Sequence, residues 1–191
     1  TGNVFRMTGG VMRITGPSSR GLIFINSDPE QTGVSGGTII AEIKNSSSNH
    51  KITTRAPFWN LEIERTVSTG TNSPVLITSG NSYGETIPNL PLIIHNSLTI
   101  RGTNEPKLKM SPSSSIHNDL HVHGNFTIEN GGEYLHGNNT TFFDGNASTV
   151  LRMPTSYTQT FNKVIVQKDA DSRYVSLLTG NNARAMEVQG E

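Results

Sequence analysis

The sequence contains no cysteine among its 191 residues. A disulfide framework, a thiolate metal site and a cysteine nucleophile are therefore excluded. Charged residues make up 16% of the chain and hydrophobic residues 32%, and both fractions are low for a globular protein. Basic and acidic residues balance at 15 each, which argues against nucleic acid as a partner because phosphate binding requires a basic surface.

Long hydrophobic runs are also missing. The longest apolar stretches, such as Leu22–Ile25 and Leu92–Ile94, are far shorter than the roughly 20 residues of a membrane-spanning helix. No stretch shows the apolar spacing of an amphipathic helix, and serine, threonine, asparagine and glycine, which are unfavourable inside helices, are abundant. The composition therefore predicts an all-β protein of short strands and polar turns, without a membrane span.

Short strands separated by turn clusters fill the first part of the chain. The runs Val11–Thr15, Leu22–Asn26 and Thr38–Ile43 are each followed by glycine, proline, serine or asparagine, which is the usual signal of a strand. Their spacing is irregular, so we predict irregular N-terminal β-coils over residues 1–57. We expect residues 58–191 to form regular coils that continue the first part and extend beyond residue 191.

A copied segment sets the expected period. Ile94–Gly102 (IHNSLTIRG) and Ile116–Gly124 (IHNDLHVHG) share an Ile-His-Asn start, a leucine and a final glycine, and |i−j| between equivalent residues is 22. Copies at such a period are typical of a solenoid. The sequence therefore predicts a parallel β-helix (β-solenoid) with about 22 residues per coil, roughly eight or nine coils and a length of about 40 Å.

This register predicts ladders of side chains along the axis. We expect inward anchors every 22 residues, with Leu98 stacked on Leu120 and Ile100 on Val122, while outward Arg101 lies beside His123. Asparagines two residues before an anchor are expected to hold the corners through hydrogen bonds. The structural ladder residues are Leu98, Ile100, Leu120, Val122, Val164, Val166, Asn96, Asn118 and Asn162, and the full set of anchors is Leu76, Leu98, Leu120, Phe142, Val164 and Met186.

Two positions test this register. Asp144 would point inward, which we interpret as a slip of register that turns Phe143 inward instead. Trp59 alternates with Leu61, so we expect it to face the core. Two other architectures are weighed against the solenoid. A leucine-rich repeat has a similar period, but its leucine motif is not met and no helical half-repeat follows. A β-sandwich does not explain the copied segment.

Several phrases resemble one protein family. Phe161–Gly180 (FNKVIVQKDADSRYVSLLTG) is similar to the "F-N-N-L-T-I-N…V-T-L" phrase of the very large secreted surface proteins of gliding Bacteroidota. Asp119–Gly145 resembles their "L-x-V-x-G-N-L-T-I-x-x-G-x-L" phrase, and the chain departs from the pattern at Lys163 and Val164. The likeness covers roughly residues 58–180. It implies a β-solenoid of a gliding-motility adhesin type that is exported by the type IX system.

Candidate chemistry centres on histidines and carboxylates. His121 and His123 are two apart on one strand and face the same side, His95 and His117 would stack, and Asp119 lies nearby, as a zinc or copper site would need. We favour a solvent-facing polar ladder, because any stacked repeat aligns such side chains. We therefore predict no cofactor. The carboxylates that a β-helix enzyme could use are Asp119, Glu129, Glu133, Asp144, Asp169 and Asp171.

The sequence indicates a non-catalytic extracellular stalk with a structural or adhesive role in a large cell-surface protein. A carbohydrate-active β-helix enzyme, a lyase or glycosidase, is the alternative, and a module that docks to surface or secretion machinery is the third. We expect partners at the coil ends, either other chains or further repeats of the same chain, because solenoid ends expose unpaired strands. Surface polysaccharide is a further expected partner.

Overall fold

The structure is a computed structural model that describes residues 4–16, 21–27, 32–43, 50–66, 75–78, 81–82, 85–86, 90–110, 118–180 and 184–189. These residues form an all-β parallel β-solenoid of about five turns with about 27 residues per turn, and they contain no helix. The predicted fold class is confirmed, whereas the predicted coil of 22 residues is too short and the predicted number of coils too large. No helix suited to crossing a membrane occurs in the described part of the chain.

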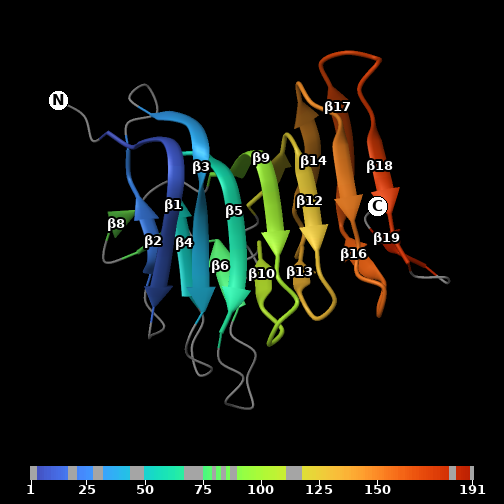
Figure 1. Cartoon of the computed structure of the whole chain (residues 1–191), viewed down its shortest axis with the longest axis horizontal. Helices are drawn as coiled ribbons and strands as arrows, with labels where there is room; N and C mark the ends of the chain where they lie inside the picture. The colour runs from blue at the N-terminus through green and yellow to red at the C-terminus, as the bar shows by residue number, and fades with distance from the viewer. Residues whose placement is uncertain are drawn as a thin grey trace.

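Two parallel sheets run along the solenoid axis, and Figure 1 shows their strands following one another from the N-terminal to the C-terminal end. Within the described residues the first sheet has ten strands: β1 (Arg6–Gly16), β3 (Gly33–Ile43), β5 (Phe58–Arg65), β9 (Leu92–Ile100), β11 (Leu120–Val122), β12 (Asn125–Ile128), β14 (Thr140–Gly145), β15 (Thr149–Arg152), β17 (Lys163–Lys168) and β18 (Val175–Leu178).

The second sheet covers the other side of the core. Its described strands are β2 (Gly21–Ile25), β4 (His50–Thr54), β6 (Val75–Thr78), β10 (Lys107–Lys109) and β13 (Glu133–Leu135). The pair β16 (Gln159–Phe161) and β19 (Met186–Val188) is separate from it. One antiparallel hairpin, β7 (Asn81–Ser82) and β8 (Glu85–Thr86), lies in the long connection between β5 and β9.

Coil length varies because the loops vary while the strand register is fixed. Thr38 and Asn60 are hydrogen-bonded at |i−j| = 22, whereas Asn60 and Ser97 meet at 37. The connection between β5 and β9 carries the β7–β8 hairpin, which accounts for the longer coil. In the next coil Arg101 meets Glu129 at 28. A single period therefore does not describe the chain.

The copied segment occupies two different places in its coils. Its first copy begins at the third residue of β9, a strand whose first half pairs with β11 and whose second half pairs with β12. Leu98 consequently lies opposite Phe126, and Leu120 lies opposite Leu92. The expected stacking of Leu98 on Leu120 is wrong, because the chain bends between β11 and β12 and both short strands align with one long strand.

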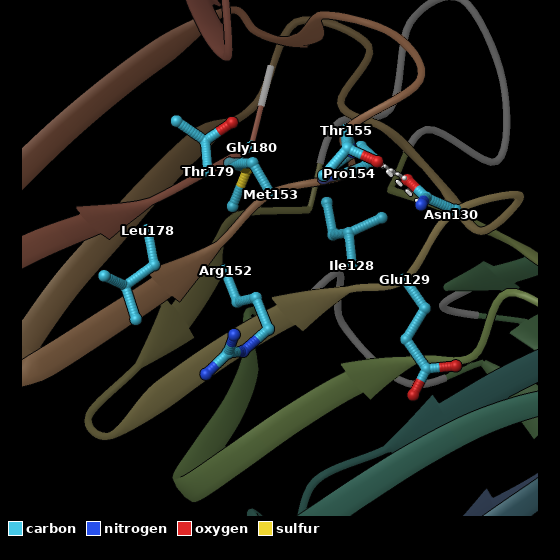
Figure 2. A pocket seen from close by; sticks show the side chains of 10 residues that line it. All are labelled: Ile128, Glu129, Asn130, Arg152, Met153, Pro154, Thr155, Leu178, Thr179 and Gly180. Carbon is cyan, nitrogen blue, oxygen red and sulfur yellow. Dashed lines mark hydrogen bonds between the residues drawn. The ribbon is translucent and has the colours of Figure 1, made fainter. Parts of the chain in front are cut away.

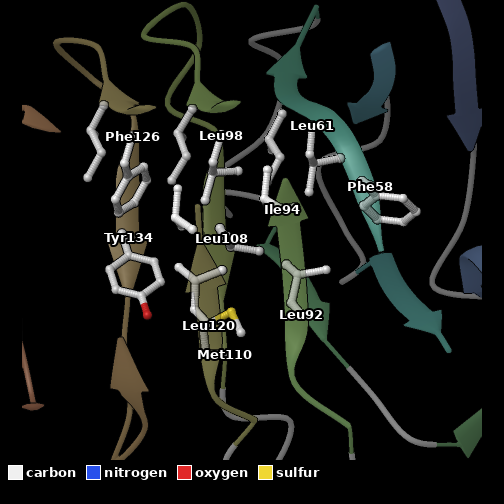
Figure 3. Close-up of a cluster of buried hydrophobic side chains, with 14 of the residues drawn as sticks. Phe58, Leu61, Leu92, Ile94, Leu98, Leu108, Met110, Leu120, Phe126 and Tyr134 are labelled. Atoms are coloured by element: carbon white, nitrogen blue, oxygen red, sulfur yellow. The ribbon is translucent and has the colours of Figure 1, made fainter. Parts of the chain in front are cut away.

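Apolar side chains of successive coils form the core in ladders. Leu61 pairs with Leu98, Leu98 with Phe126, and Phe126 with Leu151. Figure 3 shows side chains from both sheets lying against one another between the strands. The four residues of the two copies that were expected to face inward are all buried: Leu98, Ile100, Leu120 and Val122. Burial of each large apolar side chain stabilises the fold by roughly 1.5–3 kcal/mol.

The two test positions behave differently. Phe143 is fully buried and Asp144 lies on the outer face, as the slip of register predicts. The inward placement of Trp59 is wrong. A register irregularity between Phe58 and Asn60 lets Phe58 and Leu61 both face the core, and Trp59 packs outside against His95.

Gly124 marks the bend between β11 and β12. A Cβ atom placed there would lie 1.8 Å from the carbonyl oxygen of Asn96 in the preceding coil. The close approach of two backbones therefore excludes any side chain at this position.

Gly124→Ala is predicted to lower the free energy of unfolding by at least about 2 kcal/mol, because the coils must separate to admit the methyl group. Gly9→Ala is the matched control, since a Cβ atom at Gly9 meets nothing within 4 Å. Urea unfolding of both variants checks this, and equal stability of the two would contradict the packing at the bend.

Candidate functional site

The outer face of the first sheet carries a cluster of aromatic and ionisable side chains near its centre. Val122 pairs with Ile94, so the next residues, His123 and His95, are adjacent on the outside. His121 pairs with Phe142 in the same way. We call this cluster the histidine band and define it as Trp59, His95, His121, His123, Phe142 and Asp144.

His95 and His123 face each other directly. Their Nδ1 atoms are 3.1 Å apart, and their ring centroids are 5.0 Å apart. One ring must donate a proton to the other, so the contact requires that at least one of the two is neutral. Burial lowers the pKa of both imidazoles, the proximity of His123 lowers that of His95 further, and His121 and Lys168 lower that of His123 against the opposing effect of Asp144.

The carboxylate of Asp144 lies between His121, which is on β11, and His123, which is at the bend that follows β11. Its Oδ2 is 2.6 Å from His121 Nδ1, and its Oδ1 is 3.4 Å from His123 Nε2. Oδ1 is buried and has no hydrogen-bond partner among the described residues. His121 also stacks on Phe142, with centroids 4.3 Å apart. His121 and Phe142 therefore cover one face of each other's ring.

Lys168, the last residue of β17 in the neighbouring coil, lies beside the histidine band. Its Nζ donates to the carbonyl oxygens of Asp144 (2.7 Å) and His123 (3.3 Å) and to Oγ1 of Thr149 (2.8 Å). Burial lowers the pKa of Lys168, while Asp144 opposes this shift. The lysine thus ties three strands together at the outer surface.

The predicted metal candidates are brought together only in part. His121 and His123 do share a face, but the carboxylate between them is Asp144, and Asp119 instead accepts a hydrogen bond from the backbone N–H of Thr140. His117 lies outside the described residues. In the described ranges no three His, Asp or Glu side chains are arranged to hold a metal ion.

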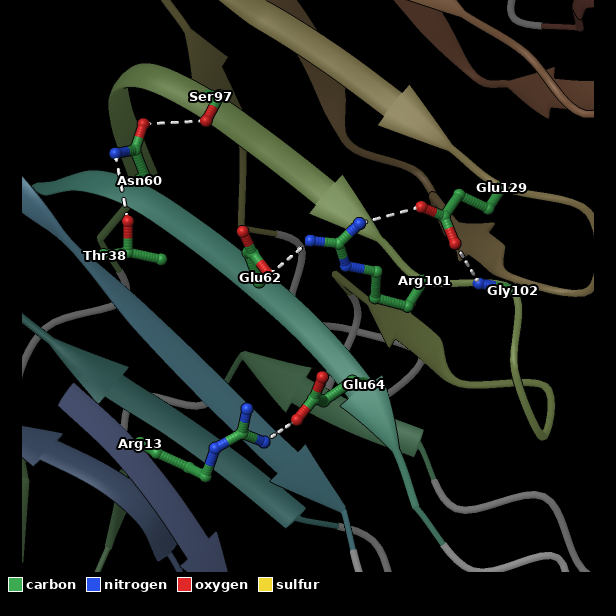
Figure 4. Close-up of polar contacts among 9 residues, drawn as sticks. All are labelled: Arg13, Thr38, Asn60, Glu62, Glu64, Ser97, Arg101, Gly102 and Glu129. Carbon is green, nitrogen blue, oxygen red and sulfur yellow. Dashed lines mark hydrogen bonds and ion pairs between the residues drawn. The ribbon is translucent and has the colours of Figure 1, made fainter. Parts of the chain in front are cut away.

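A second outer row consists of paired charges. Arg101 donates to Glu62 (2.7 Å) and to Glu129 (2.9 Å), which come from the coils on either side, as Figure 4 shows. These hydrogen bonds raise the pKa of Arg101. Arg13, on β1, forms ion pairs with Glu42 and Glu64 from the next two coils on one side of it. The expected neighbour of Arg101, His123, is wrong, because the true register places Glu129 there.

The carboxylates singled out as catalytic candidates are engaged in structural contacts, with one exception. Glu129 also accepts from the backbone N–H of Gly102, Glu133 pairs with Lys107, and Asp169 pairs with Arg173. Asp171 is the exception and is exposed in a turn. Each of these three carboxylates is therefore already engaged in an ion pair or a hydrogen bond.

Asparagines connect the coils at two corners. Asn118, Asn139 and Asn162 each lie two residues before the mutually paired Leu120, Thr141 and Val164, and Asn162 Nδ2 donates to the carbonyl oxygen of Asn139. Asn139, which the sequence did not single out, also donates to the buried hydroxyl of Tyr134.

Asn96 belongs to the other corner. Its Nδ2 donates to Oδ1 of Asn60, which also accepts from Ser97, while Asn60 Nδ2 donates to Gly37 and Thr38. Asn60 therefore links three coils. This role can be recognised only once the pairing of β5 with β3 and β9 is known.

Two shallow grooves flank the corner after β12. The larger, about 500 Å³, lies where β12, β15 and β18 end, and Figure 2 shows Asn130 meeting Thr155 at its edge. Among the described residues that line this groove, Glu129 is the one carboxylate. The smaller, about 390 Å³, is lined by Glu105, Glu133, Lys107 and Tyr157, among others. Burial, with a contribution from Glu133, raises the pKa of Tyr157 to about 12.

Comparison of the chain with protein-family models, with curated proteins and with solved structures found no match.

The His95–His123 contact predicts loss of stability in acid. Because the folded pKa of each ring lies below the ordinary 6.5, the unfolded chain binds these protons first as pH falls through 6.5, and the free energy of unfolding decreases until the folded pKa is passed. His95→Gln removes one titrating ring and should make the decrease between pH 7.5 and pH 5 shallower. His136→Gln is the control, and thermal unfolding across this range gives the comparison. Parallel pH profiles for wild type and His95→Gln would contradict the coupling.

Proposed function

We propose that this chain is a non-catalytic stalk segment of a large extracellular cell-surface protein, with a structural or adhesive role. The observation that carries the proposal is the bridging of successive coils by outer side chains, above all Arg101 between Glu62 and Glu129. Such bridges tie each coil to both neighbours and leave the charges facing one another. They suit a rod that transmits load, because each coil contacts only the next ones along the axis.

The resemblance to gliding Bacteroidota surface proteins supports an extracellular location and export by the type IX system. The repeated phrases behind that resemblance build strands and corners of the solenoid, so they are consistent with a structural role. The absence of cysteine fits a rod whose stability comes from stacked coils.

The C-terminal face of the solenoid supports a partner there. Val166 is 56% exposed, Leu177 43% and Val188 48%, although each lies opposite a buried residue of the preceding coil. Val166 and Val164 were expected inside the ladder, and Val166 is exposed because no described strand covers β17. Further coils or another chain would cover this face and pair with strand edges that have no partner among the described strands.

A carbohydrate-active enzyme is the second candidate, and the smaller groove is the observation that favours it. Glu105 and Glu133 line the same groove with Tyr157. Asn104 and Glu105 both have positive φ angles, 60° and 56°. Non-glycine residues in this region store strain, which is common at functional sites. Reciprocal hydrogen bonds between Asn104 and Arg65 hold this loop.

Incubation with a panel of microbial surface polysaccharides separates the two candidates. For a stalk we expect no new reducing ends and no unsaturated products from wild type or from Glu133→Gln, while any binding survives in the variant. If the wild type cleaves a polysaccharide and Glu133→Gln does not, the chain is an enzyme and the stalk proposal is wrong.

Charge substitutions on strand β18 test whether a partner covers the C-terminal face. We expect the chain to self-associate as its concentration rises, and Leu177→Lys to reduce this association at least tenfold by placing a charge on the exposed apolar face. Ser176→Lys, which points to the opposite side of β18, is the matched control. Sedimentation equilibrium measures the association constant. A wild-type chain that stays monomeric at all concentrations would contradict association through the C-terminal face.

A further inference from the structure

We propose that His95 and His123 bind a late transition-metal dication, Cu²⁺ above all, through their two Nδ1 atoms. The two nitrogens are 3.1 Å apart on the outer face of neighbouring coils. Two imidazole ligands about 2.0–2.1 Å from one metal ion lie roughly 2.8–3.4 Å apart, depending on the coordination angle. The pair therefore already has the separation of two adjacent ligands, and rotation of the two rings would direct both lone pairs to one point.

Asp144 prepares His123 for this role. Its Oδ1 faces His123 Nε2 at 3.4 Å and has no hydrogen-bond partner among the described residues. A proton on Nε2 gives this buried oxygen its partner and leaves the lone pair of His123 on Nδ1, toward His95. A carboxylate that holds the far nitrogen of a ligating histidine is the usual outer shell of protein metal sites.

Metal binding at the pair is balanced in protons. In the metal-free pair, neutral His95 donates its Nδ1 proton to His123 Nδ1. When the metal takes that place, the proton of His95 moves to its Nε2, and both rings remain neutral. Lowered pKa values favour this neutral form at pH 7, although His121 and Lys168 nearby also face the site.

The donor set selects the ion. Two imidazoles suit copper, nickel and zinc, and affinity in this series is highest for Cu²⁺. No third protein carboxylate or imidazole is positioned to complete the site in the described residues, so water fills the remaining positions. Ca²⁺ and Mg²⁺ prefer oxygen ligands and should not bind. The metal site does not depend on whether the chain is a stalk.

The position of Trp59 supplies the measurement. It is the only tryptophan of the chain, and its ring centroid is 6.2 Å from that of His95. Bound Cu²⁺ should quench its fluorescence, so titration of the whole chain with CuCl₂ at pH 7.5 should give saturable quenching that EDTA reverses. MgCl₂ should have no effect.

Variants assign the ligands. His95→Asn and His123→Asn should each weaken Cu²⁺ binding at least tenfold, and Asp144→Asn about tenfold through loss of the outer shell. His136→Asn should bind as wild type does, and far-ultraviolet circular dichroism verifies folding. Electron paramagnetic resonance of the Cu²⁺ complex should show two equivalent nitrogen ligands. Unchanged quenching in His95→Asn, or loss only in His121→Asn, would overturn the assignment.

Discussion

Backbone pairing between successive coils is the constraint from which the other features follow. Parallel strands lie about 4.8 Å apart, so each side chain is placed directly on its equivalent in the next coil. Inside, this stacks Leu61, Leu98 and Phe126 into one apolar ladder. Outside, the same spacing places Arg101 between Glu62 and Glu129, so that opposite charges meet along the axis. The outer polar surface is thus part of what holds the coils together.

Where backbone pairing is interrupted, a side chain replaces it. The second sheet ends at β13, and β16 pairs only with β19 among the described strands. Gln159 spans the gap, because its Nε2 donates to the carbonyl oxygen of Tyr134 and its Oε1 accepts from the N–H of the same residue. A buried amide that repeats the hydrogen bonds of a strand satisfies two polar groups that would otherwise be costly. The side chain of Gln159 thus continues the hydrogen-bonding pattern of the second sheet beyond β13.

Strand content and fold class could be predicted from the sequence, because turn residues and alternating apolar residues act locally. The coil length could not, since it depends on loops such as the connection with the β7–β8 hairpin. The copied segment misled the register because its copies begin at different points of their coils, which wrongly stacked Leu98 on Leu120. The histidine band depends on the same register: His95 meets His123, and only a 28-residue alignment of Ile94 with Val122 would have found this contact.

The central claim is that β9 and β12 are neighbours at this longer spacing. The chain has no cysteine, so pairs of introduced cysteines report contacts without interference. Thr99 and Thr127 are paired on the outer face, at a spacing that a disulfide accommodates. We predict that Thr99→Cys with Thr127→Cys forms an intramolecular disulfide under mild oxidation, whereas Thr99→Cys with His121→Cys does not. Cross-linking of the second pair and not the first would contradict the account and restore the 22-residue coil.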